Sequence, residues 1–162
     1  FGGFKMKEAV FITDIVNSLK EQGCAFVYKP PDSPASWTQS MTRFTAPKPC
    51  DIITSDKKGL ILIECKQIRK WEAFSEYDMR PSQVKALGEA KAMGQKAYVF
   101  LNVRVTAERV NVLLIFNWSK LCEIWGSQKG CIRAKEIRER CESSQAIHGL
   151  NGRYDVSAIL DL

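Results

Sequence analysis

Two acidic residues and a lysine are spaced in a way that suits phosphodiester hydrolysis. Asp51 is followed, after twelve other residues, by Glu64 and then by Lys66. Alternate side chains of a strand share a face, so Glu64 and Lys66 should point the same way and Cys65 the opposite way. If the two strands fold symmetrically about residues 55–59, Asp51 lies almost opposite Glu64, with the two Cβ atoms about 5 Å apart.

Two carboxylates this close repel each other unless a cation lies between them. Mg²⁺ accepts one or two protein carboxylates and completes its octahedron with water and phosphate oxygens. A lysine on the same face adds positive charge that can orient a water or stabilise the scissile phosphate. A second interpretation is a set of solvent-facing charges on a half-exposed hairpin. The apolar run at residues 60–63 predicts a buried strand, so it favours the interpretation as a metal site over that as a surface hairpin.

The residues around these three also form a motif. Residues 48–53, Lys-Pro-Cys-Asp-Ile-Ile, and residues 61–66, Ile-Leu-Ile-Glu-Cys-Lys, resemble the PD-(D/E)xK nuclease signature. More narrowly, they resemble archaeal-type and RecU-like Holliday junction resolvases. The match covers about residues 5–116, and it departs at Cys50, where many members of the family have proline.

The resemblance implies a role for each residue of the motif. Asp51 and Glu64 would hold Mg²⁺, with Mn²⁺ as an alternative, and Lys66 would be catalytic. Cys65, inside the motif, is counted with the metal-binding positions. The family also carries a glutamate on its first helix and a glutamine or similar residue on the helix after the motif.

Glu8 and Gln83 are the candidates for these two further positions. Glu8 lies on the apolar stripe of a predicted helix that includes Ile12 and Ile15, an unusual place for a free charge. It would position the metal or a water, although a carboxylate near a helix N-terminus is also favourable by itself. Gln83 would hydrogen-bond near the metal, or it is an ordinary polar residue at a helix start.

The elements that must position these residues follow from hydrophobic periodicity and from glycine and proline. We expect an α/β (α+β) fold with a mixed central sheet flanked by helices and a restriction-endonuclease-like core. The chain should be a single domain, with its core at about 5–116 and an extension at about 117–162. Helices are predicted at 5–22, 81–93, 117–125 and 134–141, and strands at 24–28, 50–54, 60–66, 96–103, 109–116 and 154–160.

Charge suggests a partner. The formal net charge is +6 and the sequence pI is about 9.0, which suits a polyanion such as DNA. Two segments near the motif mix cations with aromatic residues, a combination suited to branched DNA. The candidate DNA-binding residues there are Lys29, Arg43, Lys48, Arg69, Lys70 and Arg80, which are equally typical of solvated loops.

The cysteines and the absence of long apolar runs predict the surroundings of the protein. The six cysteines form no C-x-x-C pair and no signal peptide is recognisable, so we expect a reducing, intracellular setting. A zinc site at Cys131, Cys141 and His148 is disfavoured, since their spacing matches no standard zinc motif. No apolar run reaches the roughly 18 residues that a membrane span needs.

Three functions remain open. The first is a Mg²⁺-dependent Holliday junction resolvase that works as a homodimer, because a two-fold junction calls for two active sites. The second is another PD-(D/E)xK endonuclease of a repair or restriction type. The third is a DNA-binding module that keeps the fold without the chemistry. Dimerisation would favour the first, and metal-dependent cleavage would exclude the third.

Overall fold

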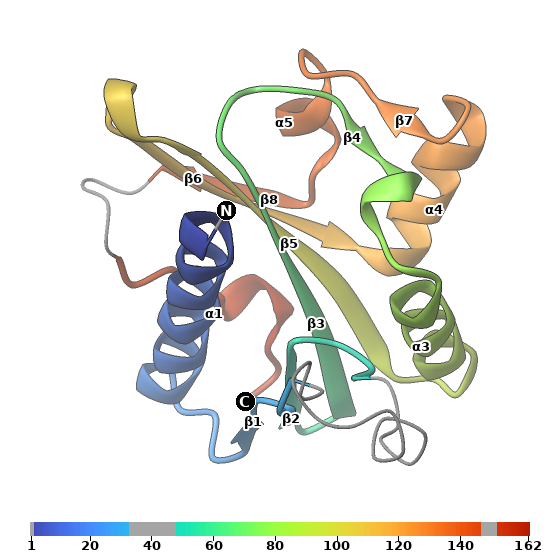
Figure 1. Ribbon diagram of the computed structural model, residues 1–162. Coiled ribbons are helices and arrows are strands. Elements are labelled where there is room, and N and C mark those ends of the chain that lie inside the picture. The colour runs from blue at the N-terminus through green and yellow to red at the C-terminus, as the bar shows by residue number, and fades with distance from the viewer. Residues whose placement is uncertain (1, 33–47, 147–151) are drawn as a thin grey trace, which may run out of the picture.

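The computed structural model describes residues 2–32, 48–146 and 152–162, with side chains from residue 8 onward. Helices and strands are distributed along the whole described chain (Figure 1). The helices are α1 (Gly2–Glu21), α3 (Pro81–Ala92), α4 (Trp118–Ser127) and α5 (Ile137–Arg140), with 3-10 turns η1 (Glu76–Asp78), η2 (Thr106–Glu108) and η3 (Ser157–Ile159). The strands are β1 (Val27–Tyr28), β2 (Ile52–Asp56), β3 (Gly59–Ile68), β4 (Phe74–Ser75), β5 (Lys96–Val105), β6 (Val110–Asn117), β7 (Cys131–Ile132) and β8 (Ser143–Ala146).

The main sheet has six strands in the order β1-β2-β3-β5-β6-β8. β3 and β5 are parallel, whereas the other neighbouring strands are antiparallel. Helix α1 lies on one side of this sheet, and α3 and α4 lie on the other (Figure 1). β4 and β7 form a separate two-stranded sheet beside α4. The predicted mixed sheet flanked by helices is therefore confirmed.

The sheet separates two apolar cores, and β3 contributes to both. On the α1 side, Ile61, Ile63 and Cys65 pack in the cluster that contains Phe11 and Ile15 of the helix. On the other side, Leu62 of β3 packs with the core residues of α3 and α4. This alternation fixes which way the residues after Leu62 point, so Glu64 and Lys66 belong to the α3 side.

The two longest predicted helices are confirmed, and glycines with positive φ follow both. In α1, Ile12, Ile15 and Leu19 are buried at helical spacing, and Gly23 (φ 94°) follows the helix. Helix α3 starts at Pro81, whose fixed φ suits a first helical position, and Gly94 (φ 80°) follows its end.

The predictions for the C-terminal third were partly wrong. Residues 154–160 were predicted as a strand, but residues 157–159 form a 3-10 turn and the rest is irregular. Tyr154, Val156 and Ile159 are buried in the α1-side core. These apolar residues therefore hold an irregular segment against the fold and do not form a strand. The sequence also gave no sign of β8, a polar strand that pairs with β6. The helix expected at 134–141 is only the single turn α5.

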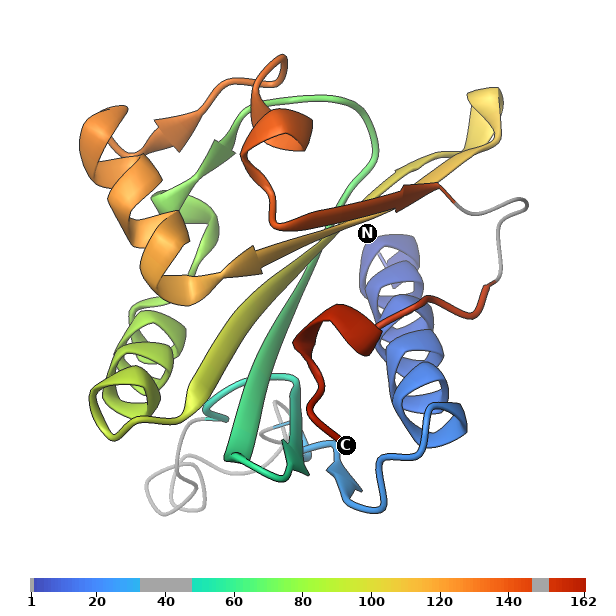
Figure 2. The same cartoon turned by 180° about the vertical axis from the view of Figure 1, so that it is seen from behind.

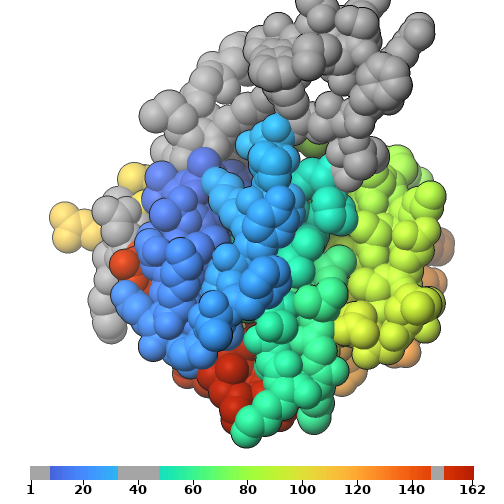
Figure 3. All heavy atoms as spheres, turned by 90° about the horizontal axis from the view of Figure 1, so that it is seen from below, coloured from blue at the N-terminus to red at the C-terminus, as the bar shows by residue number. Residues whose placement is uncertain are grey.

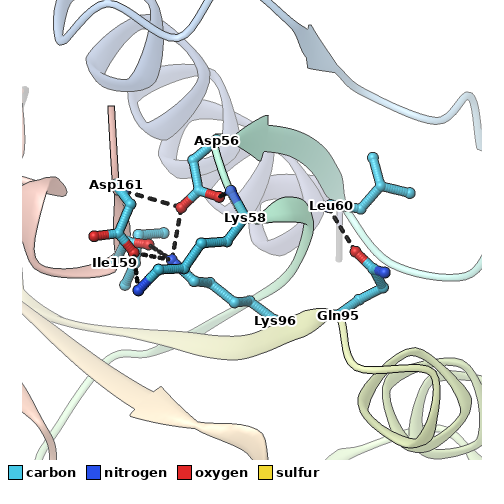
Figure 4. Close-up of polar contacts among 7 residues, drawn as sticks. All are labelled: Asp56, Lys58, Leu60, Gln95, Lys96, Ile159 and Asp161. Atoms are coloured by element: carbon cyan, nitrogen blue, oxygen red, sulfur yellow. Dashed lines mark hydrogen bonds and ion pairs between the residues drawn. The ribbon is translucent and has the colours of Figure 1, made fainter.

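The C-terminal segment lies on the α1 side of the sheet and returns to the hairpin of β2 and β3 (Figure 1 and Figure 2). Lys96 Nζ donates to Asp56 Oδ2 at 2.6 Å, to Asp161 Oδ2 at 3.0 Å and to the Ile159 carbonyl oxygen at 3.0 Å. The Asp161 N–H also donates to Asp56 Oδ2 at 2.9 Å. Figure 4 shows these contacts, which join β2, β5 and the C-terminal segment.

The cysteines and the helices can be compared with the reducing, intracellular setting expected from the sequence. All six cysteines lie within the described residues and are free thiols. None of the helices that the structure describes is both long and apolar enough to cross a membrane. His148, the third member of the disfavoured zinc trio, lies outside the described residues.

Candidate active site

The hairpin of β2 and β3 brings the two acidic residues together. Ile52 pairs with Ile63, and the Asp51 N–H donates to the Ile63 carbonyl oxygen at 3.2 Å. Continued by one residue, this register puts Asp51 opposite Glu64, as expected from the sequence. Both are buried, with 5% and 1% of their surface exposed. Residues 65–68 of β3 pair with β5 alone among the described strands, so the pair lies where this edge of β3 becomes open.

Asp51 is held on both of its oxygens. Oδ2 accepts a hydrogen bond from the Cys65 N–H at 2.9 Å. Oδ1 lies 2.8 Å from the ammonium of Lys48, which also lies 2.8 Å from Asp32 Oδ1. Burial alone would lower the pKa of Lys48, but its hydrogen bonds with Asp32 and Asp51 outweigh burial and raise that pKa. Lys48 therefore stays charged inside the site.

Glu64 has one oxygen with partners and one without. Oε1 accepts from Gln83 Nε2 at 2.6 Å and lies 3.6 Å from Lys66 Nζ. Oε2 is buried and has no hydrogen-bond partner among the described residues. Burial, joined by repulsion from Asp51 and partly offset by Lys66, raises the pKa of Glu64 to about 9. The bare oxygen marks a position where a cation or a donor would complete the carboxylate.

Gln83, in the first turn of α3, connects the lysine to the glutamate. Its Oε1 accepts from Lys66 Nζ at 3.2 Å and from the Arg80 N–H at 2.9 Å, while its Nε2 donates to Glu64. The amide is thus fixed at both ends and positions the ammonium beside the carboxylate. The Lys66 side chain is 17% exposed, so part of its surface faces solvent.

Glu8 borders the same site from α1. It is half-buried, and burial raises its pKa, with the positive charge of Lys66 opposing this shift and the negative charge of Asp51 adding to it. These interactions place Glu8 within electrostatic range of the site from the other side of the sheet. In Figure 3, the surface around β1 and β2 lies between α1 and α3, the helices that supply Glu8 and Gln83.

Cys65 contributes its main chain to the site, whereas its thiol faces the α1 core. The side chain is fully buried in the apolar cluster around Phe100, and burial raises the thiol pKa well above its usual value. A neutral, buried thiol is a poor metal ligand. The expectation of a metal-binding role for this position is therefore restricted to its backbone.

The carboxylates of the site suit a divalent cation that keeps part of its water shell. Among the described residues, no group of three or more His, Cys, Asp or Glu side chains is arranged as a metal cage. Mg²⁺ does not need such a cage, because it keeps several waters and uses one or two carboxylates together with substrate phosphates. Asp51 and Glu64, with the unpartnered Glu64 Oε2, match this requirement.

The predicted DNA-binding residues are distributed unequally. Lys29, Arg69, Lys70 and Arg80 are exposed, whereas Lys48 is paired with Asp51 of the site and with Asp32. Arg43 lies outside the described residues. The sequence prediction missed Arg104, which lines a hollow of about 230 Å³ together with Arg69, Gln67 and residues 105–107. The nearness of Arg104 to Arg69 follows from the parallel register of β3 and β5, which pairs Gln67 with Asn102 and which the sequence does not show.

Comparisons with known proteins give similarity to solved structures but none to a family model or a curated protein. The chain is similar to the solved structure of Hjc from Archaeoglobus fulgidus, a Holliday junction resolvase from an archaeal hyperthermophile. The identity is 19% and the TM-score is 0.42, over 65% of this chain and 72% of that chain. The sequence motif formed by residues 48–53 and 61–66 resembles the same class of protein.

Proposed function

We propose that this protein is a divalent-metal-dependent endodeoxyribonuclease that cuts four-way DNA junctions. The observation that carries the proposal is the buried pair of Asp51 and Glu64, with Glu64 Oε2 unpartnered and Lys66 beside it. A buried polar group without a partner costs about 1–3 kcal/mol, and more when it is charged. Such a cost is explained when a ligand completes the group in the working state.

Asp51 and Glu64 would hold Mg²⁺, or Mn²⁺ in its place. A cation bound there would lower the pKa of a water and polarise the scissile phosphate. Both ligands supply carboxylate oxygens, which hard cations prefer. The N–H of Cys65 keeps Asp51 oriented, and Gln83 does the same for Glu64.

Lys66 and Glu8 complete the proposed chemistry. The Lys66 ammonium, fixed by Gln83, would stabilise negative charge that develops on the phosphate. Glu8 would orient the attacking water, and its raised pKa makes its carboxylate a better proton acceptor than an exposed glutamate.

DNA would approach over the exposed cations near the site. Lys29, Arg69, Lys70 and Arg80 would contact backbone phosphates and fix the register of the strand. Arg104 joins this group because it shares a hollow with Arg69. The excess of positive charge over the whole chain supports binding to DNA.

The proposed working unit is a homodimer of single-domain chains, acting inside the cell on branched double-stranded DNA. A junction with two-fold symmetry requires two symmetric nicks, and the described residues of one chain contain one such site. The six free thiols are consistent with a reducing compartment.

The test is a cleavage assay with Mg²⁺ on a labelled four-way junction, a linear duplex and a single strand of equal length. We expect symmetric nicks in the junction only. Lys66→Ala should reduce the single-turnover rate by about 10²-fold or more while leaving junction binding nearly unchanged. Lys85→Ala, which removes an exposed lysine from α3, is the matched control and should cut like the wild type.

The other outcomes separate the alternatives. Cleavage of linear duplex as well would keep the nuclease and indicate a repair or restriction type of enzyme. Tight junction binding without any cleavage, with either Mg²⁺ or Mn²⁺, would contradict the proposal and indicate a DNA-binding module.

A further inference from the structure

Lys48 contacts the Asp51 oxygen that does not accept the Cys65 N–H. Its Nζ lies 2.8 Å from Asp51 Oδ1, and the side chain is only 18% exposed. The other Asp51 oxygen already accepts the Cys65 N–H. Lys48 was expected from the sequence to contact DNA, but its ammonium is the closest positive charge to Asp51 in the described contacts.

A divalent cation on Asp51 would meet this ammonium directly. Metal–oxygen distances for Mg²⁺ are about 2.0–2.1 Å, so a cation on Oδ1 would lie within roughly 5 Å of Lys48 Nζ. Two positive charges this close repel strongly in a site that is mostly shielded from water. The ammonium and the metal therefore compete for the same carboxylate oxygen.

Lys48 also has a second partner that would keep it bound after such an exchange. Asp32 Oδ1 lies 2.8 Å from the ammonium, and the Asp32 side chain is 83% exposed. Asp32 thus lies on the solvent side of Lys48, whereas Asp51 is buried. The side chain can move outward toward Asp32 and remain paired.

We propose that Lys48 is an internal counter-ion that neutralises Asp51 before the metal binds and is displaced from it by the metal. This inference rests on the proposed function, since it assumes that Asp51 is a metal ligand. It explains how the buried Asp51 carboxylate is tolerated beside Glu64 in the metal-free protein, where an uncompensated charge would be strongly destabilising. Lys48 weakens metal binding and at the same time stabilises the metal-free fold.

The experiment measures Mn²⁺ binding by titration calorimetry without DNA, on the wild type, Lys48→Met, Lys48→Arg and Lys85→Met. Methionine keeps most of the length of the lysine side chain and removes its charge. We expect Lys48→Met to bind Mn²⁺ about tenfold more tightly or better, because the competing charge is gone. Lys48→Arg and the exposed control Lys85→Met should bind within about twofold of the wild type.

Thermal unfolding of the same proteins gives an independent measurement. Without metal, Lys48→Met should melt at a lower temperature than the wild type, since Asp51 has lost its counter-ion. Saturating Mn²⁺ should raise the melting temperature of Lys48→Met by more than that of the wild type. A variant too unstable to titrate would still test the idea through this metal-dependent rise.

Two results would overturn the inference in different ways. If the wild type binds Mn²⁺ and Lys48→Met binds it equally well or more weakly, Lys48 supports the site and does not compete with the metal, and the proposed function stands. If neither the wild type nor any variant binds Mn²⁺ or Mg²⁺, the proposed metal-dependent function fails together with the inference.

Discussion

At the scale of single residues, Glu64 combines almost complete burial with a neighbouring negative charge. Both conditions disfavour its ionised form, and burial is the larger of the two. Gln83 compensates one oxygen and leaves the other without a partner. A buried glutamate of this kind lowers the stability of the fold. We expect it to be retained only because activity requires the carboxylate, since a neutral residue at this position would make the fold more stable.

The substitution Glu64→Gln tests this trade-off. Glutamine has the same shape, and its carbonyl oxygen can still accept from Gln83. Because its pKa is raised, Glu64 must take up a proton when the chain folds near neutral pH, a cost that glutamine does not carry. We expect the metal-free variant to be more stable by about 1–2 kcal/mol in urea unfolding and to lose cleavage of the junction. Glu89→Gln, an exposed change on α3, is the control and should alter neither property. A less stable variant that still cuts would contradict both assignments.

At the scale of elements, the parallel pairing of β3 and β5 brings Arg69 and Arg104 to one hollow at the end of these strands. Gln67 pairs with Asn102 in this register. Arg69 and Arg104 each lie two residues further along their own chain segment, after Gln67 and Asn102 respectively. The buried amides of Gln67 and Asn102 are hydrogen-bonded at 2.8 Å, so the end of the sheet beneath the arginines is held firmly. Two guanidinium groups lining one hollow would suit a backbone phosphate of the DNA that we propose as substrate.

The hollow leads to a prediction about salt dependence. Arg104→Ala should weaken junction binding and lower the slope of log affinity against log salt by about 0.9, the value for one lost phosphate contact. The single-turnover cleavage rate at saturating DNA should not change, since the hollow does not include the carboxylates. Arg133→Ala removes the same charge from an exposed position outside the hollow and serves as the control. An unchanged slope for Arg104→Ala would rule out the phosphate contact.

The elements also show how much of the site the sequence could predict. Turn position and side-chain alternation place Asp51 opposite Glu64, and helical periodicity puts Glu8 and Gln83 on faces toward the sheet. These patterns are local. The contact between Lys48 and Asp51 depends on the path of a loop, and the neighbourhood of Arg69 and Arg104 depends on a pairing between strands separated by α3. Neither leaves a periodic signal in the sequence.

At the scale of the whole molecule, the C-terminal segment connects parts of the fold that are distant in sequence. Asp56, at the end of β2, accepts from Lys96 on β5 and from the N–H of Asp161. The Lys57 N–H donates in turn to the Asp161 carbonyl oxygen at 3.0 Å. The sequence alone predicted a strand at residues 154–160, whereas polar contacts to the hairpin of β2 and β3 hold this segment in place. Stability of the site-bearing hairpin should therefore depend on Asp56.

The pH dependence of unfolding tests the role of Asp56. Burial opposes ionisation of its side chain, but the hydrogen bond from Lys96 and the N–H groups of Asp161 and Lys58 outweigh it, so its pKa falls from 3.8 to about 2. An acid with a lowered pKa stabilises the fold at pH values above about 4, and this stabilisation disappears as the pH falls toward 2. Asp56→Asn should thus lower the free energy of unfolding by about 1–3 kcal/mol at pH 7 in urea, and by much less near pH 2. Glu89→Gln, which changes an exposed carboxylate, should follow the wild type throughout. An equal loss for Asp56→Asn at both pH values would mean that the charge of Asp56 does not hold the C-terminal segment to the hairpin.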